Sequence, residues 1–215
     1  MKNLTKKQRL IFDEFANNSF LRTNLYFTGG TALSAVYLQH RLSEDLDFFS
    51  EKEFDIQTIT DIITKWSRKL AFAFERREIG NAHIHQFQFE DGENLKVDFA
   101  LYPYELLEKG KVVKGVSIDS LLDIATNKLL TISQRTQVKD FVDLYFLLKK
   151  YTIWDLIDGA KVKFRLKTEP LLVAYDFLKV ESFENLPEML KPLTLEELKM
   201  FFREKAKQLG KMATE

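Results

Sequence analysis

Alternating polar and apolar positions mark strands in the first half of the chain. In residues 83–89 (HIHQFQF) polar side chains alternate with apolar ones at most positions, which is typical of a strand buried on one face. An Asp-Gly turn signal follows, and residues 95–101 (LKVDFAL) form the expected return strand of a hairpin. Shorter apolar runs at residues 24–28 and 46–49 predict two further strands.

Helical periodicity dominates elsewhere. Thr5 and Gln8 have the spacing of a capping box, which predicts a helix that ends near residue 17. Thr194 and Glu197 repeat this pattern near the C-terminus. The other segments with helical periodicity are residues 31–40, 55–74, 119–133, 137–150, 152–166, 169–180 and 194–209.

This order of elements predicts an α+β protein with two domains. Strands and helices are mixed up to about residue 107, and the chain beyond it is mostly helical. We therefore expect a small mixed or antiparallel sheet flanked by helices in residues 1–107. Residues 108–215 are expected to form a helical C-terminal domain.

Composition narrows the class of protein. The chain has 215 residues, 45% of them hydrophobic, which is enough for a sizeable core. Its 32 Lys and Arg residues balance 32 Asp and Glu residues, so a strong overall field that attracts nucleic acid is excluded. The absence of cysteine excludes disulfides and thiolate chemistry. No apolar run reaches membrane-spanning length and no secretory signal is present, so we expect a soluble cytoplasmic protein.

Two aspartates accompany the strand at residues 46–49. Asp45 and Asp47 are two positions apart, so their side chains face the same side of the strand. Neighbouring carboxylates repel each other and a divalent cation relieves that repulsion, so the pair predicts a Mg²⁺ site. The alternative is a polar strand end with two solvated acids.

Asp98 lies in the middle of the otherwise apolar strand at residues 95–101, where an unpaired charge is unfavourable. If this strand lies beside residues 46–49, Asp98 becomes a third carboxylate of the same site. Three acids can hold two metal ions, which stabilise the attacking and leaving oxygens of phosphoryl transfer. The alternative is a salt bridge between Asp98 and an outward lysine.

A glycine pair lies upstream of these acids. Gly29 and Gly30 follow the strand at residues 24–28 and precede a helical pattern. The start of a helix presents backbone N–H groups and the positive end of the helix dipole, which suits a phosphate. Thr31 could add a hydroxyl group. A tight turn without a ligand explains the glycine pair equally well.

Charged residues recur on two later helices. Lys128 falls on the inward stripe of its helix and therefore needs an anion. Asp140 and Asp143 interrupt an otherwise apolar helix, and Arg135 and Lys139 lie close to them in sequence. One interpretation is a buried ion-pair network between the helices. The other is that Lys128 and Arg135 contact nucleotide phosphates, which Asp140 or Asp143 orients.

The stretch from Gly29 to Phe49 resembles a signature of the AbiEii-type nucleotidyltransferases. These are toxins of type IV toxin–antitoxin (abortive infection) systems in the DNA polymerase β-like nucleotidyltransferase superfamily. The matching residues of the first signature, a glycine turn, a His-Arg pair and a Ser-x-Asp-Leu-Asp-Phe strand, are Gly29, Gly30, His40, Arg41, Ser43, Asp45, Leu46, Asp47 and Phe48. The second signature, a helical lysine followed by Lys-Asp-x-x-Asp-Leu, is matched by Lys128, Lys139, Asp140, Asp143 and Leu144.

The resemblance implies a polymerase β-like core with a helical C-terminal domain. It implies transfer of a nucleotidyl group from an NTP with Mg²⁺, or Mn²⁺ in its place. The implied acceptor is either RNA, with tRNA among the candidates, or protein. The implied partner is a cognate antitoxin encoded nearby, and no association with a membrane is implied. The implied metal ligands are Asp45, Asp47 and Asp98, which are also catalytic together with Lys128 and Asp140. The implied nucleotide-binding residues are Gly29, Gly30, Thr31, Arg41, Ser43, Arg135, Lys139 and Asp143.

Two alternative functions are compatible with the same sequence. A metal-dependent phosphohydrolase or nuclease would employ the same acids to cleave instead of transfer. A catalytically silent interaction module would keep the fold without binding metal or NTP.

Overall fold

The structure, a computed structural model, describes residues 1–212 and comprises two compact units. The sheet unit contains Met1–Tyr37, Ser43–Glu105 and Lys109–Asp119. The helical unit contains Leu38–Leu42, Leu106–Glu108 and the described residues from Ser120 onward. The sequence predicted a single boundary after residue 107, whereas the contacts assign Leu38–Leu42 and Leu106–Glu108 to the helical unit and Lys109–Asp119 to the sheet unit. Residues 213–215 of the predicted C-terminal domain lie outside the described residues.

A mixed sheet forms the centre of the sheet unit. Its five strands lie in the order β1-β2-β5-β4-β3. The pairing of β2 with β5 is parallel and the other pairings are antiparallel. The predicted α+β class is therefore confirmed, as is the predicted hairpin formed by β4 and β5. The strands are β1 Tyr26–Thr28, β2 Leu46–Ser50, β3 Phe72–Ile79, β4 Ala82–Phe89 and β5 Asn94–Leu101.

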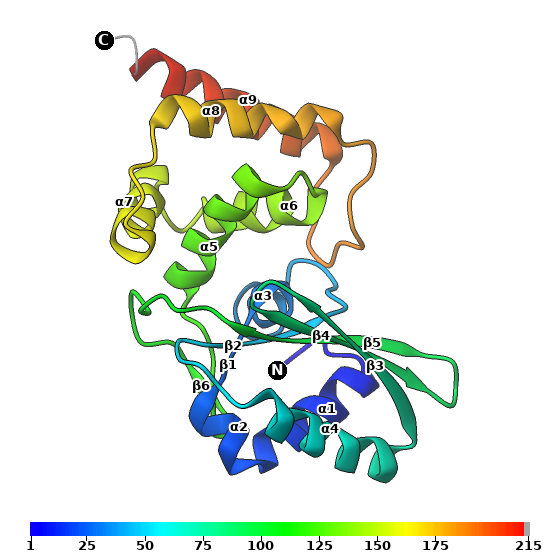
Figure 1. The fold of residues 1–215 in the computed structure, drawn as a ribbon. Coiled ribbons are helices and arrows are strands. Elements are labelled where there is room, and N and C mark those ends of the chain that lie inside the picture. The colour runs from blue at the N-terminus through cyan, green and yellow to red at the C-terminus, as the bar shows by residue number, and fades with distance from the viewer. Residues whose placement is uncertain (213–215) are drawn as a thin grey trace. The chain divides into compact units, whose positions relative to one another are not determined.

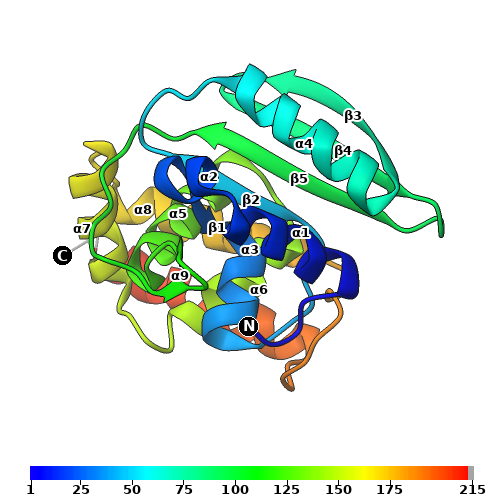
Figure 2. The ribbon, with the colours of Figure 1, turned by 90° about the horizontal axis from the view of Figure 1, so that it is seen from below.

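Helices cover one face of this sheet, as Figures 1 and 2 show for α1 and α4. On that face the ring of Phe15 from α1 stacks on Phe48 from β2 with centroids 3.9 Å apart, and Phe48 contacts Phe99 from β5. All three phenylalanines are fully buried. The helical segments and the small hairpin of this unit are α1 Lys6–Asn17, α2 Ser19–Asn24, α3 Gly29–Ala32, the π-helix η1 Leu33–Leu38, α4 Ile56–Leu70, β6 Val112–Val113 and β7 Val116–Ser117.

The opposite face of β2 and β5 carries the charged side chains. Successive side chains of a strand point to opposite faces, so the burial of Phe48 and Phe99 turns Asp47 and Asp98 away from the core. The hydrophobic alternation of these strands thus fixes which side of the sheet bears the acids.

Two predicted element boundaries in this unit differ from the structure. The helix expected at residues 55–74 ends at Leu70, because Ala71 adopts a left-handed conformation with φ of 53° and the chain then continues as β3. The segment before β1 is the short helix α2, capped by the side chain of Asn18, and the strand begins only at Tyr26.

The helical unit consists of packed helices. The capping box predicted at Thr194 is present, since Thr194 N donates to Oε2 of Glu197 at 2.6 Å and Glu197 N donates to Oγ1 of Thr194 at 3.2 Å. No helix within residues 1–212 is both long enough and apolar enough to span a bilayer. The helices are α5 Leu121–Gln134, α6 Val138–Leu147, α7 Ile153–Phe164, α8 Pro170–Leu178, the 3-10 helix η2 Lys179–Ser182 and α9 Leu195–Met212.

Candidate active site

The parallel pairing of β2 and β5 places Asp47 directly opposite Asp98. Paired residues of neighbouring strands project from the same face, so the two carboxylates are neighbours. Asp45 immediately precedes β2. The sequence expectation that the strand of Asp98 lies beside residues 46–49 is therefore confirmed, while the role of these acids as metal ligands stays a prediction.

Lys96 places a positive charge among these acids. Its Nζ lies 3.1 Å from Oδ2 of Asp45 and 2.8 Å from Oδ2 of Asp98. Burial by itself would lower the pKa of Lys96, but Asp98, Asp45 and Asp47 together raise it above the ordinary value. Lys96 is the lysine of the salt-bridge alternative, and it joins two of the predicted ligands instead of pairing with Asp98 alone.

The donor set suits a hard divalent cation. Mg²⁺ and Mn²⁺ prefer carboxylate oxygens, and the ammonium of Lys96 is already held by two of these carboxylates as a cation. Within residues 1–212, no three His, Asp or Glu side chains stand ready-arranged around a metal position. The carboxylate oxygens are therefore suitable ligands for such an ion. Lys96 would have to move before these acids could surround a metal.

Gly29 makes room for Asp47. Its φ of +74° is a conformation that favours glycine, and a Cβ atom at this position would lie only 2.8 Å from Cγ of Asp47. The antiparallel pairing of Thr28 with Asp47 brings the glycine turn to this carboxylate. The glycine that the sequence assigned to a phosphate cradle thus adjoins one of the predicted metal ligands.

Thr31 connects the glycine turn with the approach to β2. Its hydroxyl donates to the main-chain carbonyl of Asp45 and is 2.8 Å from Oγ of Ser43. A carbonyl can only accept, so the Thr31 proton is committed there and Ser43 donates to Thr31. Thr31 is also only 2% exposed. This arrangement gives Thr31 a structural role, and the expected contact between its hydroxyl and a phosphate stays a prediction.

Asp119 is a buried polar residue that the sequence analysis did not assign. Its Oδ2 accepts a hydrogen bond from Oγ1 of Thr28 at 2.6 Å, and its carbonyl accepts one from the hydroxyl of Tyr37 at 2.9 Å. Thr28 directly precedes Gly29, so Asp119 holds the end of β1 from which the glycine turn starts. The only signal in the sequence is a single acid within the run GVSIDSLL.

The helical unit contains a buried ion-pair cluster. Nζ of Lys128 lies 2.7 Å from Oδ1 of Asp140 and 2.6 Å from Oδ2 of Asp143. Burial alone would lower the pKa of Lys128, but Asp143 and Asp140 raise it. The ammonium therefore has two protein carboxylates as partners, which favours the ion-pair interpretation. The expected contact between Lys128 and a nucleotide phosphate stays a prediction.

Asp143 also binds the His-Arg pair of the first signature. Nε of Arg41 lies 2.7 Å from Oδ1 of Asp143, and Nε2 of His40 lies 2.7 Å from the same oxygen. Burial would raise the pKa of Asp143, but Lys128, Arg41 and His40 lower it well below its usual range. The carboxylate is thus charged, and it fixes the segment that leads into the strand of Asp45 and Asp47.

Arg135 and Lys139 lie beside this cluster on the surface. Nε of Arg135 lies 2.8 Å from Oδ2 of Asp140, and its side chain is 48% exposed. Burial would raise the pKa of Asp140, but Lys128 and Arg135 lower it. Lys139 is half-buried. Their predicted contacts with a nucleotide stay predictions.

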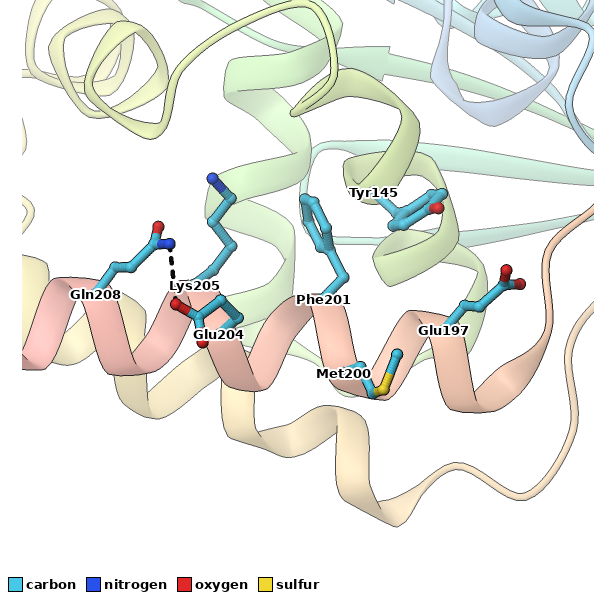
Figure 3. A pocket seen from close by; sticks show the side chains of 7 residues that line it. All are labelled: Tyr145, Glu197, Met200, Phe201, Glu204, Lys205 and Gln208. Carbon is cyan, nitrogen blue, oxygen red and sulfur yellow. Dashed lines mark hydrogen bonds between the residues drawn. The ribbon is translucent and has the colours of Figure 1, made fainter.

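A groove of about 530 Å³ runs along α9 in the helical unit (Figure 3). It combines aromatic side chains with charges of both signs. None of the predicted site residues lines it, so we do not assign it to the nucleotide. The lining residues are Tyr145, Glu197, Met200, Phe201, Glu204, Lys205 and Gln208.

Comparison with known proteins gives a family and a fold. The sequence model of the family described as "Nucleotidyl transferase AbiEii toxin, Type IV TA system" matches residues 9–211. Protein aq_aa25 of Aquifex aeolicus (strain VF5), itself uncharacterized, is 33% identical over 215 residues, which cover 97% of this chain and 98% of that protein.

Two crystal structures from Helicobacter pylori share the fold. One, described as a candidate nucleotidyltransferase, has a TM-score of 0.59 and 21% identity, with 97% of each chain covered. The other, JHP933, has a TM-score of 0.55 and 21% identity, with 98% of this chain and 97% of JHP933 covered.

Proposed function

Since the chain belongs to the family of AbiEii nucleotidyl transferase toxins, we propose that it transfers a nucleotidyl group from an NTP to an RNA or protein acceptor with Mg²⁺. The observation that carries this proposal is the pairing of Asp47 with Asp98 across two parallel strands, with Asp45 just before the first of them. A row of acids on one face of a sheet, beside a glycine turn, is what a metal-bound triphosphate requires.

Each residue has a defined task in this proposal. Asp45, Asp47 and Asp98 hold the metal, which when bound neutralises phosphate charge. Gly29 leaves the space next to Asp47 free of side-chain atoms. Gly29 and Gly30 also open a helical segment whose first N–H groups have no acceptors within the helix, so these groups can donate to a phosphate.

The reaction exchanges one bond to the α-phosphorus for another. The acceptor oxygen forms the new bond, the bond from the α-phosphorus to the bridging oxygen breaks, pyrophosphate leaves, and the acceptor proton passes to water. The chain contributes mainly positioning and charge, as is general for phosphoryl transfer. The buried neighbours Leu46 and Phe48 hold the strand of the acids rigidly in place.

A cluster of the helical unit holds the segment that precedes Asp45 in the sequence. Asp143 fixes His40 and Arg41, and the chain reaches Asp45 a few residues later. We assign Lys128, Asp140 and Asp143 to this supporting cluster. Binding of a nucleotide by Arg135 and Lys139 is a second part of the proposal, because both lie at the surface of the cluster.

The experiment is incubation of the protein with each α-³²P-labelled NTP, Mg²⁺, total RNA and total protein. Label that becomes attached to RNA or protein supports nucleotidyl transfer and identifies the NTP and the acceptor class. Shortening of the RNA without attached label would support the phosphohydrolase or nuclease alternative. A separate calorimetric titration measures binding of each NTP with Mg²⁺. If no NTP gives a heat of binding, the silent interaction module is supported.

Membership of the family also supports a role as a toxin with a cognate antitoxin. The test is expression of the chain in a bacterial host with and without the gene encoded next to it. Growth arrest that the neighbouring gene relieves would support this role. Growth that is unaffected by strong expression of the active enzyme would oppose it.

A further inference from the structure

Lys96 is a basic residue in direct contact with two of the predicted metal ligands. Its side chain is 34% exposed, while those of Asp45 and Asp98 are 29% and 14% exposed. The ammonium is 3.1 Å from Asp45 and 2.8 Å from Asp98, so it bridges an acid that precedes β2 and an acid on β5. A single cation thus links two strands at the point where the metal is proposed.

An ammonium and a divalent ion compete for these carboxylates. The ammonium is held by Oδ2 of Asp45 and Oδ2 of Asp98, and a divalent ion bound by the same two carboxylates would lie within a few ångströms of it, where the like charges repel strongly. Metal binding therefore requires that Lys96 withdraw. The lysine stem is flexible and the side chain reaches solvent, so withdrawal needs rotation of side-chain bonds and no change of the strand.

We infer that Lys96 is an internal counter-cation that competes with the divalent metal for Asp45 and Asp98. This inference rests on the proposed function, because it concerns the same metal site. In the metal-free protein Lys96 neutralises part of the charge of three neighbouring acids and so keeps β2 and β5 together. When a metal ion binds these carboxylates, the metal neutralises their charge in place of Lys96. The residue at position 96 therefore sets the metal affinity.

A purely structural salt bridge has the opposite consequence. If Lys96 only held the acids in their binding geometry, its removal would disorganise the site and weaken metal binding. Competition instead predicts that removal of the positive charge tightens metal binding. The direction of the change in affinity therefore separates the two roles.

The test uses Mn²⁺ titration followed by electron paramagnetic resonance, together with thermal melts at increasing Mg²⁺. We expect Lys96→Met to bind Mn²⁺ at least about tenfold more tightly than the wild type, because a unit charge a few ångströms from a divalent ion is removed. Lys96→Arg keeps the charge and is expected to bind no more tightly than the wild type. Without metal, Lys96→Met is expected to melt below the wild type, and saturating Mg²⁺ should reduce that difference.

The matched control is Lys65→Met, which removes an exposed lysine from α4. It is expected to leave the Mn²⁺ affinity unchanged within twofold, on the order of what distant screened surface charges contribute. If the wild type binds Mn²⁺ and Lys96→Met binds it equally or more weakly, the inference is overturned while the proposed function stands. If the wild type and all variants bind neither Mn²⁺ nor Mg²⁺, the metal-dependent function is overturned together with it.

Discussion

The guanidinium of Arg41 forms a bidentate ion pair with the carboxylate of Asp143, with Nε 2.7 Å from Oδ1 and Nη2 2.9 Å from Oδ2. The two residues belong to two different family signatures and are 102 positions apart in the sequence. The pair is almost fully buried, since Arg41 is 3% exposed and Asp143 is not exposed at all. The second signature therefore anchors the His-Arg pair of the first, which precedes Asp45 and Asp47 in the sequence.

The first prediction concerns Asp143→Asn. The substitution keeps the shape of the side chain but leaves the buried charges of Arg41 and Lys128 with one carboxylate fewer. Breaking a buried ion pair in this way costs about 3–5 kcal/mol, so urea denaturation should show a loss of stability of that size. The control Asp158→Asn changes an exposed acid of α7 and should cost less than about 0.5 kcal/mol. Equal stability of both variants would contradict the anchoring role.

The second prediction concerns Lys128→Met. Because Asp140 and Asp143 are its partners, the variant should lose about 3 kcal/mol of stability and still be stabilised by NTP with Mg²⁺. A nucleotide-binding lysine would give the reverse pattern, with stability nearly unchanged and the NTP-induced shift lost. Thermal melts with and without NTP and Mg²⁺ distinguish the two patterns. Lys150→Met, at an exposed position, serves as the charge control.

The third prediction separates backbone strain from contact with the site. In Gly29→Ala the added Cβ meets Asp47, whereas in Gly92→Ala, with a similar φ of +83°, nothing lies within 4 Å. Both variants carry the strain of a left-handed alanine, which is on the order of 1 kcal/mol. Only Gly29→Ala should also lose Mn²⁺ binding and transferase activity. Similar activity in the two variants would show that the contact with Asp47 is unimportant.

The fourth prediction concerns stability at acidic pH. Burial lowers the pKa of His85 to about 4, compared with 6.5 for an exposed histidine. Between these values the unfolded chain binds a proton that the folded chain does not, so stability falls as the pH decreases from about 6.5 to about 4. The total loss from this residue is roughly 3 kcal/mol. Denaturation at a series of pH values should therefore show a shallower slope over this window for His85→Leu than for the wild type. Parallel pH profiles would refute this assignment.

Asp140 and Asp143 affect the stability of the fold in a lower pH range than His85. Burial raises the pKa of both, but their cationic partners lower it below the usual value. Their contribution is therefore complete above the unfolded pKa of about 4 and is lost as the pH falls towards the folded pKa. The window assigned to His85 lies above that range, so the two effects can be measured separately.

Local patterns were sufficient to predict much of the sheet and the candidate site. The alternation in residues 83–89 and 95–101 arises because one face of each strand is buried, and it predicted the hairpin. β3 was missed because it is an edge strand, and a long charged run of exposed residues hides its alternation. The short helix α2 offers too few residues for a periodic signal.

The contacts that the sequence did not predict depend on distant pairing. The contact of Lys96 with Asp45 requires β5 to lie beside β2, which brings residues 51 positions apart together. Similarly, the resemblance implies that Arg41 binds the nucleotide, but the sequence does not predict that its side chain binds Asp143 far along the chain. Periodicity reports which face a residue occupies, but not which distant residue it meets.

Nucleotidyl transfer by this chain is tested by the transfer of label from α-³²P-labelled NTPs by the wild type, Asp47→Asn and Glu44→Gln. Asp47 lies opposite Asp98 and beside Gly29, while Glu44 is an exposed acid of the same stretch. Circular dichroism and thermal melts establish that each variant is folded, and Asp47→Asn should be at least as stable as the wild type without metal because it relieves repulsion between acids. We predict transfer by the wild type and by Glu44→Gln, and none by folded Asp47→Asn. Equal transfer by the wild type and Asp47→Asn would contradict the role of Asp47 as a catalytic metal ligand.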